Sequence, residues 1–317
     1  MILVLAGGVG GAKLAQGLAS QLPPEELLIV VNTGDDFIHL GLHISPDVDT
    51  VMYWLAGLND RIRGWGLAGE TWNFMTALGR LGDPTWFRLG DSDLATHVVR
   101  TQRLACSETL SEVTRHLSRQ LGIAHHVAPM SDDSVRTIIH TTDGTLAFQD
   151  YFVRLRCAPT VTAVSFDGIE KAAPSPAFIA AMADPHLRTI VICPSNPLLS
   201  IDPILSIPGV LQWLRQRRVP AVAVSPIVGG QAIKGPAAKI LRELGRDVSV
   251  LGIAEHYRGL IDGLVIDAID EITAPAIEGL GLSVTVTNTV MANLDDQKAL
   301  ASVALALAAQ IADGAHA

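Results

Sequence analysis

The chain has 317 residues, of which 49% are hydrophobic and only 17% charged; this excludes a disordered chain and suffices for a large buried core. The formal net charge of −9 argues against a nucleic-acid-binding surface, so an anionic ligand must be bound by backbone amides, a few placed cations or a metal bridge. The cysteines, Cys106, Cys157 and Cys193, are widely spaced and odd in number, which is typical of reduced thiols in a cytoplasmic protein and gives no support to a zinc site.

The first 36 residues predict a βαβ unit. Residues 1–6 form an unbroken apolar run that ends at glycines, as expected of a strand buried on both faces of a parallel sheet. A helix over residues 12–22 and a second strand over residues 27–31 complete the unit. The N-terminal run is too short for a signal peptide or a membrane span, and the Ala-rich run 299–312 predicts a packed terminal helix.

The middle of the chain predicts less regular structure. Residues 40–86 carry four of the five tryptophans together with several glycines. Helices are expected over residues 50–56, 92–104 and 109–121. Alternating runs at residues 135–140 and 145–150 flank Asp143-Gly144, a hairpin signal. We therefore predict a smaller inserted helical and β-rich subdomain over roughly residues 130–185.

Alternating strands and helices return after residue 188. Strands are expected over residues 189–193, 221–224, 248–252, 263–266 and 283–286, and helices over residues 204–216 and 236–244. This alternation predicts a single α/β domain over residues 1–317, with a Rossmann-like, mostly parallel sheet and helices on both faces.

A glycine-rich segment, Gly7-Gly8-Val9-Gly10-Gly11-Ala12-Lys13, lies between the first predicted strand and the first predicted helix. Glycine permits positive φ and close approach of a ligand, and a helix N-terminus offers free N–H groups to an anion. The spacing is neither that of a Walker A loop nor a strict GxGxxG. We interpret Gly7, Gly8, Gly10, Gly11 and Lys13 as a nucleotide-phosphate-binding loop, with a tight structural turn as the alternative.

Two acidic segments follow the second predicted strand. Asp35 lies at a strand end, where ligands gather in open α/β sheets. Asp47 and Asp49 precede a helical segment, and we expect one of them to be its N-cap. Mg²⁺ prefers one or two carboxylates together with phosphate oxygens and water, so Asp35 and Asp49 are the predicted metal ligands. Ordinary turn caps are the alternative.

Three further loops carry candidate ligand-binding groups. Arg88 stands before a glycine turn, where it would clamp a phosphate or a polar ring edge. Ser195 and Asn196 follow a buried strand, and Ser225 opens a glycine-containing loop that continues to Lys234. Each of these loops has capping or turn chemistry as its alternative. Because several such loops end strands at one sheet edge, they predict a cleft for a phosphorylated ligand.

Several segments taken together resemble one family. In chain order they are GGVGGAKL, NTGDD, SPDVDTVMYWLAGL, RLGDSDLATHVVR, PMSDDSVRT, FQDYFVR, PSNPLLSIDPILSIPG and AVSPIVGGQAIKGPAAK. With these motifs, spread over nearly its whole length, the chain resembles the 2-phospho-L-lactate transferase family of coenzyme F420 biosynthesis.

The resemblance implies a cytoplasmic, Mg²⁺-dependent transferase. Its donor would be a guanosine-diphosphate-activated phospho-acid and its acceptor the ribityl hydroxyl of the deazaflavin Fo, with GMP released and (dehydro)coenzyme F420-0 formed. The Gly10-Gly11-Ala12 form of the glycine loop leaves phospholactate, phosphoenolpyruvate and a phosphoglycerate-type acid open as the transferred group. The resemblance is compatible with a homodimer, and neither a nucleic acid nor a membrane is an expected partner.

The resemblance also implies roles for individual residues. Asp49 and Arg88 would contact the deazaflavin, Asp35 and Asp49 would lie at the metal, and the glycine loop with Ser195, Asn196 and Ser225 would hold the nucleotide. Asp49 or Asp35 would orient or deprotonate the acceptor hydroxyl. A metal-ligating aspartate is a poorer base, so one residue does not fill both roles.

Two other functions remain open from the sequence. A nucleotide-sugar-binding regulatory protein of the related fold, without transferase activity, is the main alternative, and the PDVDT and RLGDSD segments favour the transferase over it. A nicotinamide dehydrogenase is a third interpretation, but a clean GxGxxG is missing and Asp35 comes late for a ribose-binding acid.

Overall fold

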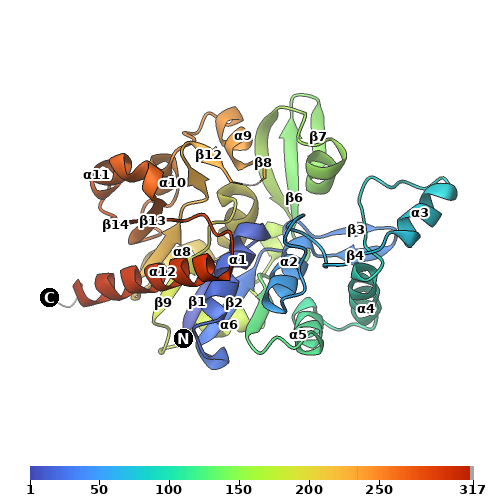
Figure 1. Cartoon of the computed structure of the whole chain (residues 1–317), viewed down its shortest axis with the longest axis horizontal. Coiled ribbons are helices and arrows are strands. Elements are labelled where there is room, and N and C mark those ends of the chain that lie inside the picture. Colours follow the sequence, from blue (N-terminus) through green and yellow to red (C-terminus); the bar gives the residue numbers. More distant parts are fainter. Residues whose placement is uncertain (234, 315–317) are drawn as a thin grey trace.

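The computed structural model, which describes residues 1–233 and 235–314, is built around one parallel sheet (Figure 1). Its strand order is β14-β13-β10-β9-β1-β2-β5, and each neighbouring pair is parallel. The strands are Ile2–Ala6 (β1), Leu27–Val31 (β2), His126–Pro129 (β5), Thr189–Ile192 (β9), Ala221–Val224 (β10), Gly263–Asp267 (β13) and Ser283–Thr287 (β14). The chain runs outward from β1 to β5 and then returns to the other side of β1 at β9. This confirms the predicted Rossmann-like fold.

The central strands are apolar because both of their faces are covered. β1 reads ILVLA and β2 reads LLIVV, and both strands are buried at every position. Their side chains divide between two cores: Leu3 and Leu5 belong to one, Val4 and Ala6 to the other. The unbroken apolar runs of the sequence therefore correspond to a sheet packed on both sides.

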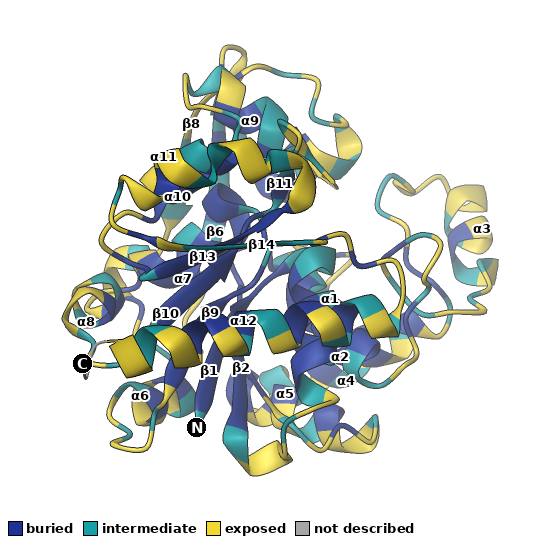
Figure 2. Ribbon diagram, turned by 60° about the vertical axis from the view of Figure 1, so that its left-hand side comes forward, coloured by how far each residue is buried: buried dark blue, intermediate teal, exposed yellow. Residues whose placement is uncertain are grey.

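Helices form the outer layers on both faces of the sheet. The core that contains Val4 is covered by Gly8–Ala19 (α1), Pro46–Leu55 (α2), Leu110–Gln120 (α5) and Leu294–Gly314 (α12). The core that contains Leu5 is covered by Pro176–Met182 (α6), Asp202–Ser206 (α7), Val210–Gln216 (α8), Ala237–Glu243 (α9), Val250–His256 (α10) and Ala274–Glu278 (α11). Figure 2 shows α1 and α12 side by side over the buried strands.

Two excursions leave the sheet at the carboxyl ends of its strands. The first contains the short antiparallel pair Phe37–His39 (β3) and Leu42–Ile44 (β4), then Asn73–Arg80 (α3) and Asp93–Ala105 (α4). α3 projects from the body of the molecule (Figure 1). A small separate cluster of Ile44, Met75 and Leu89 supports this excursion.

The second excursion is a three-stranded antiparallel sheet of Arg136–Thr141 (β6), Gly144–Ala147 (β7) and Val161–Asp167 (β8). The hairpin predicted at Asp143-Gly144 is thus confirmed. Ile139 and Val161 pack in the same core as Leu5 of the main sheet. The division into a main domain and an insertion over residues 130–185 stays a prediction.

Two predicted elements after β9 are wrong. The strand expected over residues 248–252 is instead the beginning of α10, because the Ser249 side chain accepts a hydrogen bond from the N–H of Gly252 (3.0 Å) and caps a helix. The single helix expected over residues 204–216 is divided into α7 and α8. Gly209, with φ of 86°, makes the break between them.

Two helices near the predicted site begin earlier than expected. α1 starts at Gly8 rather than at residue 12, so the glycine-rich segment forms its first turn. α2 starts at Pro46 rather than at residue 50, so Asp47 and Asp49 lie in its first turn. Both carboxylates are therefore held on a rigid element and not on a loop.

Within the described residues, no single helix combines the length and the apolar composition of a membrane span. One bent pair, Pro197–Ser206 with Val210–Gln216, meets these criteria jointly.

Gly17 determines how closely α1 approaches α12. A Cβ atom at Gly17 would lie 2.2 Å from the carbonyl oxygen of Gln297. In a free helix, replacing glycine by alanine is stabilising by about 1 kcal/mol. In this protein we expect Gly17→Ala to lower the free energy of unfolding by about 1–3 kcal/mol, because the two helices must separate.

Urea denaturation of Gly17→Ala and of a control, Gly79→Ala, measures this effect. A Cβ at Gly79 in α3 would make only an ordinary contact, 3.5 Å from Cγ2 of Thr85. The control is expected to be as stable as the parent or slightly more so. Equal stabilisation by both substitutions would contradict the close helix contact.

Candidate active site

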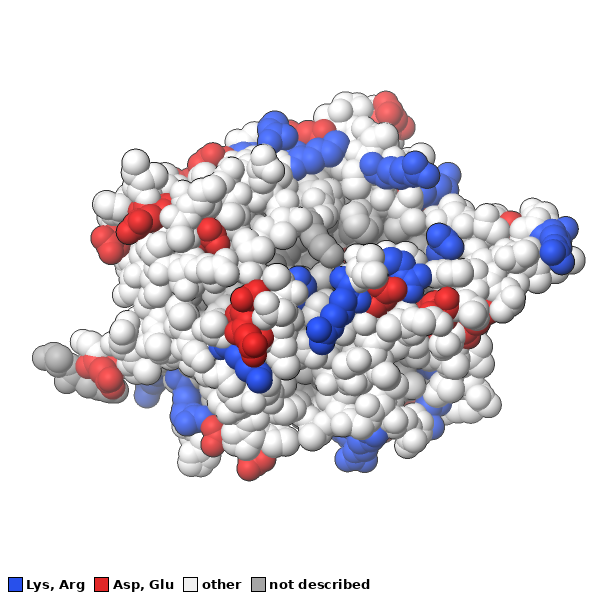
Figure 3. All heavy atoms as spheres, in the orientation of Figure 1, with Lys and Arg blue, Asp and Glu red and all other residues white. Residues whose placement is uncertain are grey.

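The carboxyl ends of the central strands open into one cavity of about 730 Å³. In Figure 3 the face of the molecule is hollowed at its centre, with lysine and arginine side chains above, to the right of and below the hollow and acidic side chains to its left. The cavity brings together most of the predicted site residues: Gly7, Gly8, Gly10, Lys13, Asp35, Asp49, Arg88, Ser195 and Asn196. The convergence of strand-end loops predicted from the sequence is confirmed.

Two predicted residues lie behind the cavity wall instead of on it. A Cβ at Gly11 would lie 2.7 Å from Oγ of Ser195, so Gly11 allows α1 to pack closely on the loop after β9. The Ser225 hydroxyl is bonded within its own loop, donating to the carbonyl of Ile227 (3.0 Å) and accepting from its N–H (3.1 Å). Lys234 lies outside the described residues.

The glycines of the first turn of α1 have different tasks. Gly8 adopts a φ of 61°, which favours glycine. At Gly10 a Cβ would lie 2.3 Å from the carbonyl oxygen of Pro194, so this glycine permits close packing. The N–H of Gly7 donates to Oγ of Ser195 (3.1 Å), and that hydroxyl donates to the carbonyl of Gly7 (2.8 Å). The segment is thus a tight structural turn and also places a helix N-terminus at the cavity.

Lys13 connects this turn to the far edge of the site. Its Nζ donates to the carbonyl of Met291 (2.5 Å), in the segment between β14 and α12. The same ammonium lies 5.6 Å from the centroid of the Trp54 ring. Lys13 therefore joins α1, α2 and the C-terminal part of the sheet beside the cavity.

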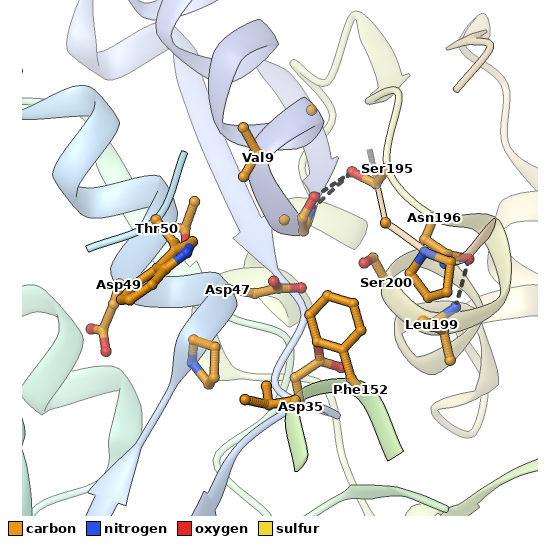
Figure 4. Close-up of a pocket in the computed structure, with 18 of the residues that line it drawn as sticks. Val9, Asp35, Asp47, Asp49, Thr50, Phe152, Ser195, Asn196, Leu199 and Ser200 are labelled. Carbon is orange, nitrogen blue, oxygen red and sulfur yellow. Dashed lines mark hydrogen bonds between the residues drawn. The ribbon is translucent and has the colours of Figure 1, made fainter. Parts of the chain in front are cut away.

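Asp35 and Asp47 form a pair of buried carboxylates on the floor of the cavity (Figure 4). The side-chain amide of Asn32 donates to both of them, at 3.1 Å to Oδ1 of Asp35 and at 3.0 Å to Oδ2 of Asp47. Burial and the neighbouring charge of Asp47 raise the pKa of Asp35 well above its ordinary value. Burial likewise raises the pKa of Asp47 to about 6, although Asn32 and the N–H of Gly8 donate hydrogen bonds to it.

Such a pair of carboxylates suits a divalent cation. Two oxygen-rich groups, buried and repelling one another, would be stabilised by a hard cation that also contacts phosphate oxygens. No cluster of three or more His, Cys, Asp or Glu side chains with metal-site geometry occurs among residues 1–233 and 235–314.

Asp49 has a different environment from Asp35 and Asp47. Arg100, whose side chain is completely buried, donates from Nη1 to Oδ2 of Asp49 (3.1 Å) and from Nη2 to Oδ1. Asp49 is therefore paired with a buried guanidinium, although burial still holds the pKa of Asp49 above its ordinary value. The structure thus pairs Asp35 with Asp47 and not with Asp49.

The expectation that Asp47 or Asp49 caps α2 is wrong. Ser45 occupies the N-cap position, and its hydroxyl donates to Oδ2 of Asp36 (2.6 Å) instead of capping the helix. The two carboxylates lie one and three residues after Pro46, the first residue of the helix. There they can face the cavity while the helix N-terminus favours their negative charge.

A polar network continues from Asp49 into α4. His97 lies between two carboxylates, with Nδ1 3.6 Å from Asp49 and Nε2 3.4 Å from Asp93. The Tyr53 hydroxyl donates to Asp93 (2.6 Å). Burial raises the pKa of Asp93, but hydrogen bonds from His97 and Tyr53 outweigh it and leave this pKa below its ordinary value. Asp49, Tyr53, Asp93 and His97 all line the cavity.

Another part of the cavity lining, called the aromatic wall below, is aromatic and cationic. The Arg88 guanidinium lies 4.1 Å from the centroid of the Trp72 ring, which also contacts Arg63 at 5.0 Å. The residues of this wall that reach the cavity are Arg63, Trp65, Trp86, Phe87 and Arg88. A planar ring with polar edges would find both stacking surfaces and donors there.

The comparison with known proteins decides the family. The model of the family described as 2-phospho-L-lactate transferase CofD matches residues 2–302. The chain belongs to this family. The predicted family and the predicted enzymatic transferase activity are thereby confirmed, and the regulatory-protein and dehydrogenase alternatives are set aside.

Relatives named as two different transferases have the same sequence identity to the chain. It is 39% identical to a phosphoenolpyruvate transferase of Kitasatospora aureofaciens, with 99% of both chains covered. It is also 39% identical to a 2-phospho-L-lactate transferase of Methanococcoides burtonii, with 98% of this chain and 100% of the relative covered. A solved structure of a upf0052-family protein from Bacillus halodurans shares the fold, with a TM-score of 0.61 at 14% identity over 96% of this chain and 98% of the other.

Some residues of this CofD-family site were not predicted from the sequence. Asp93, His97 and Arg100 recur at helical spacing on one face of α4, a pattern that could have indicated their common environment. Asp47 was considered, but as an alternative cap. Nothing in the sequence around Asn32 shows that its amide bridges two carboxylates, because Asp47 is 15 residues away.

The paired carboxylates predict an unusual pH dependence of stability. A carboxyl group whose pKa is raised by folding favours the folded state fully below its unfolded pKa of about 4, and this contribution is lost as the pH rises through the folded value. For Asp47 the folded value is about 6, so the free energy of unfolding of the metal-free protein should fall between about pH 4 and pH 6. Asp47→Asn should reduce this fall, leaving the part that Asp35 contributes, and should raise stability at pH 8 by up to about 3 kcal/mol.

Thermal unfolding of chelator-treated protein at pH 4 and pH 8 tests this expectation. Asp167→Asn, at an exposed position on β8, is the control and should keep the pH dependence of the parent. A lower stability of Asp47→Asn than of the parent at pH 8 would contradict the expectation that the two buried carboxylates destabilise the folded state at that pH.

Proposed function

We propose that the protein transfers a phospho-acid from a guanosine-diphosphate-activated donor to the ribityl hydroxyl of the deazaflavin Fo, in coenzyme F420 biosynthesis, and releases GMP. The observation that carries this proposal is the position of the Asp35–Asp47 pair. The pair lines one cavity together with tight backbone turns and with aromatic and cationic side chains.

The wall of backbone turns suits the nucleotide diphosphate. It is formed by the first turn of α1 with Ser195 and Asn196 after β9. Asn196 accepts hydrogen bonds from the N–H groups of Leu198 (3.0 Å) and Leu199 (3.3 Å), which fixes this second turn. Positive helix ends and placed amides are the groups by which an acidic protein binds a polyanion.

The aromatic wall suits the deazaflavin. Trp86 and Phe87 offer apolar surface, and Arg88 is held over Trp72 where its guanidinium can meet a polar ring edge. Asp49 lines the same cavity, with His97 Nδ1 3.6 Å away, and is the carboxylate that we assign to the ribityl chain extending from the ring.

Asp35 and Asp47 would hold Mg²⁺ in this site. Bound there, Mg²⁺ would neutralise negative charge that develops on the GMP leaving group. Asp47 thus takes the place of Asp49 in our sequence-based assignment of metal ligands. Asp49 is then available for the acceptor alone, which removes the conflict between ligating a metal and handling a proton.

The reaction in this arrangement is an in-line displacement. The ribityl oxygen forms a bond to the phosphorus that carries the phospho-acid, the bond from that phosphorus to the GMP oxygen breaks, and the proton of the ribityl hydroxyl passes to Asp49. Asp49, held by Arg100, accepts a hydrogen bond from the attacking hydroxyl and orients it. Positioning and charge neutralisation supply most of the catalysis in such a reaction.

Phospholactyl, enolpyruvyl-phosphate and phosphoglyceryl donors all remain candidates, since relatives named for two of these acids are equally similar. The deciding experiment supplies Fo and each activated donor and identifies the products by mass spectrometry. Formation of a deazaflavin phosphodiester together with GMP is expected in the presence of Mg²⁺ and not after chelation. No deazaflavin product with any of these donors would contradict the proposal.

Asp49→Asn should lower the transfer rate by about 10²-fold or more, because an amide orients the acceptor hydroxyl poorly and cannot take its proton. Asparagine keeps the shape of the side chain but leaves the buried Arg100 guanidinium without its countercharge, which should lower the free energy of unfolding by about 3–5 kcal/mol. Thermal unfolding verifies that the assayed variant is folded. The exposed variant Asp167→Asn again serves as the control. Turnover of Asp49→Asn at the parental rate with Fo and donor would refute the assigned role.

Arg88→Ala should weaken the binding of Fo more than that of GDP. The guanidinium belongs to the aromatic wall and is remote along the chain from the turns assigned to the nucleotide. We expect the dissociation constant for Fo to rise by roughly tenfold, as for loss of one charge-assisted contact, with that for GDP nearly unchanged. Calorimetry with each ligand measures this, and equal losses would contradict the division of the cavity.

A further inference from the structure

One segment that lines the cavity has no part in the function proposed above. It follows β7 and contains a π-helix over Asp150–Arg154. Phe148, Gln149, Phe152, Val153 and Arg156 of this segment reach the cavity. The side-chain amide of Gln149 donates to the backbone carbonyl of Asp35 (3.3 Å), which fastens the segment beside the carboxylate pair.

The segment is held firmly in an uncommon conformation. The N–H of Leu155 donates to the carbonyl of Asp150 (2.8 Å), the wide hydrogen-bond spacing of a π-turn. Arg156 and Cys157 follow with φ of 51° and 58°, a region that non-glycine residues seldom adopt. On the other side, Tyr151 is fully buried, and Lys239 lies 3.3 Å from its hydroxyl. Strained conformations that the surroundings enforce are typical of functional sites.

This conformation presents an aromatic ring to the carboxylates. Phe152 is 38% exposed and lines the cavity together with Phe148 and Val153 of the same segment. Its ring is stacked on that of Phe148, with centroids 5.4 Å apart and planes at 8°. Figure 4 shows the Phe152 ring beside Asp35 and Asp47, with Ser200 on its other side. A phenyl ring can neither ligate a metal nor bind a phosphate, so its place there calls for another role.

Exclusion of water is the role that fits. An apolar ring over a phosphoryl group occupies the volume in which a competing water would stand. Asp35 and Asp47 are only 7% and 6% exposed, so little water reaches the floor beside the ring. Phe148 backs the ring, so it cannot swing away without losing its stacking partner.

We propose that Phe152 decides which nucleophile attacks the activated donor, by excluding water from the phosphorus while the acceptor hydroxyl enters from the aromatic wall. This inference rests on the proposed function. In the reaction it suppresses, a water oxygen bonds to the phosphorus, the bond to the GMP oxygen breaks, and the water proton passes to solvent. That side reaction yields GMP and free phospho-acid without any deazaflavin product.

The ratio of GMP released to deazaflavin product formed therefore measures the role of Phe152. The parent should give a ratio near one. Phe152→Ala should raise the ratio by about tenfold, because a water-sized space opens beside the phosphorus, whereas Phe152→Leu, which keeps an apolar cover, should stay near the parent. Thermal unfolding of both variants verifies that the fold is kept. If the alanine variant does not fold, the same comparison is made between Phe152→Leu and Phe152→Ser.

Trp86→Ala is the contrasting variant. Trp86 lies on the aromatic wall, so its loss should raise the KM for Fo, while saturating Fo should restore a ratio near one. If Phe152→Ala or Phe152→Ser leaves the ratio near one, the inference is overturned. This holds even if the KM for Fo rises, because the ring would then only contact the acceptor. In that case the parent still forms the deazaflavin product, and the proposed function stands. Absence of that product from the parent would overturn both.

Discussion

The active site depends on one side-chain amide. Oδ1 of Asn32 accepts the N–H of Gly34 (2.8 Å), which fixes the amide so that its nitrogen faces the carboxylates of Asp35 and Asp47. The same nitrogen lies 3.2 Å from the carbonyl of Leu199. The end of β2, the first turn of α2 and the π-helix after β9 are thus joined at a single buried group. An unpaired donor at this place would be costly, so the arrangement is strongly constrained.

The acidic residues of the cavity divide into two electrostatic classes. Asp35 and Asp47 share hydrogen bonds but repel each other, which leaves the floor of the site in need of positive charge. Asp49 has already received its positive charge from Arg100. Asp47 and Asp49, only two positions apart in the sequence, therefore differ in whether a ligand must bring a positive charge to them. The two carboxylates differ because Arg100, a residue of α4, pairs with Asp49.

The sequence predicted the sheet and the convergence of its loops, because buried parallel strands are unbroken apolar runs and their carboxyl ends meet at one edge. It did not predict where α1 and α2 begin, since the glycines that allow α1 to pack against Pro194 resemble a loop. Arg100 was missed because its partner is 51 residues away. Phe152 was missed because a π-helix departs from the 3.6-residue periodicity by which helical faces are recognised. Long-range pairing and irregular backbone conformations thus account for most of the site residues that could not be predicted from the sequence.

The two π-helices that flank the cavity, Asp150–Arg154 and Pro197–Ile201, make chain length at these points a determinant of the site. A π-turn holds one residue more than an α-helical turn, so losing a residue there would return the segment to α-helical geometry and rotate the residues after it by about 100°. Insertions and deletions, rather than substitutions, are therefore the changes that would most abruptly replace the side chains facing the donor. Evolution within this architecture can alter the chemistry of the site while every strand of the sheet stays in register.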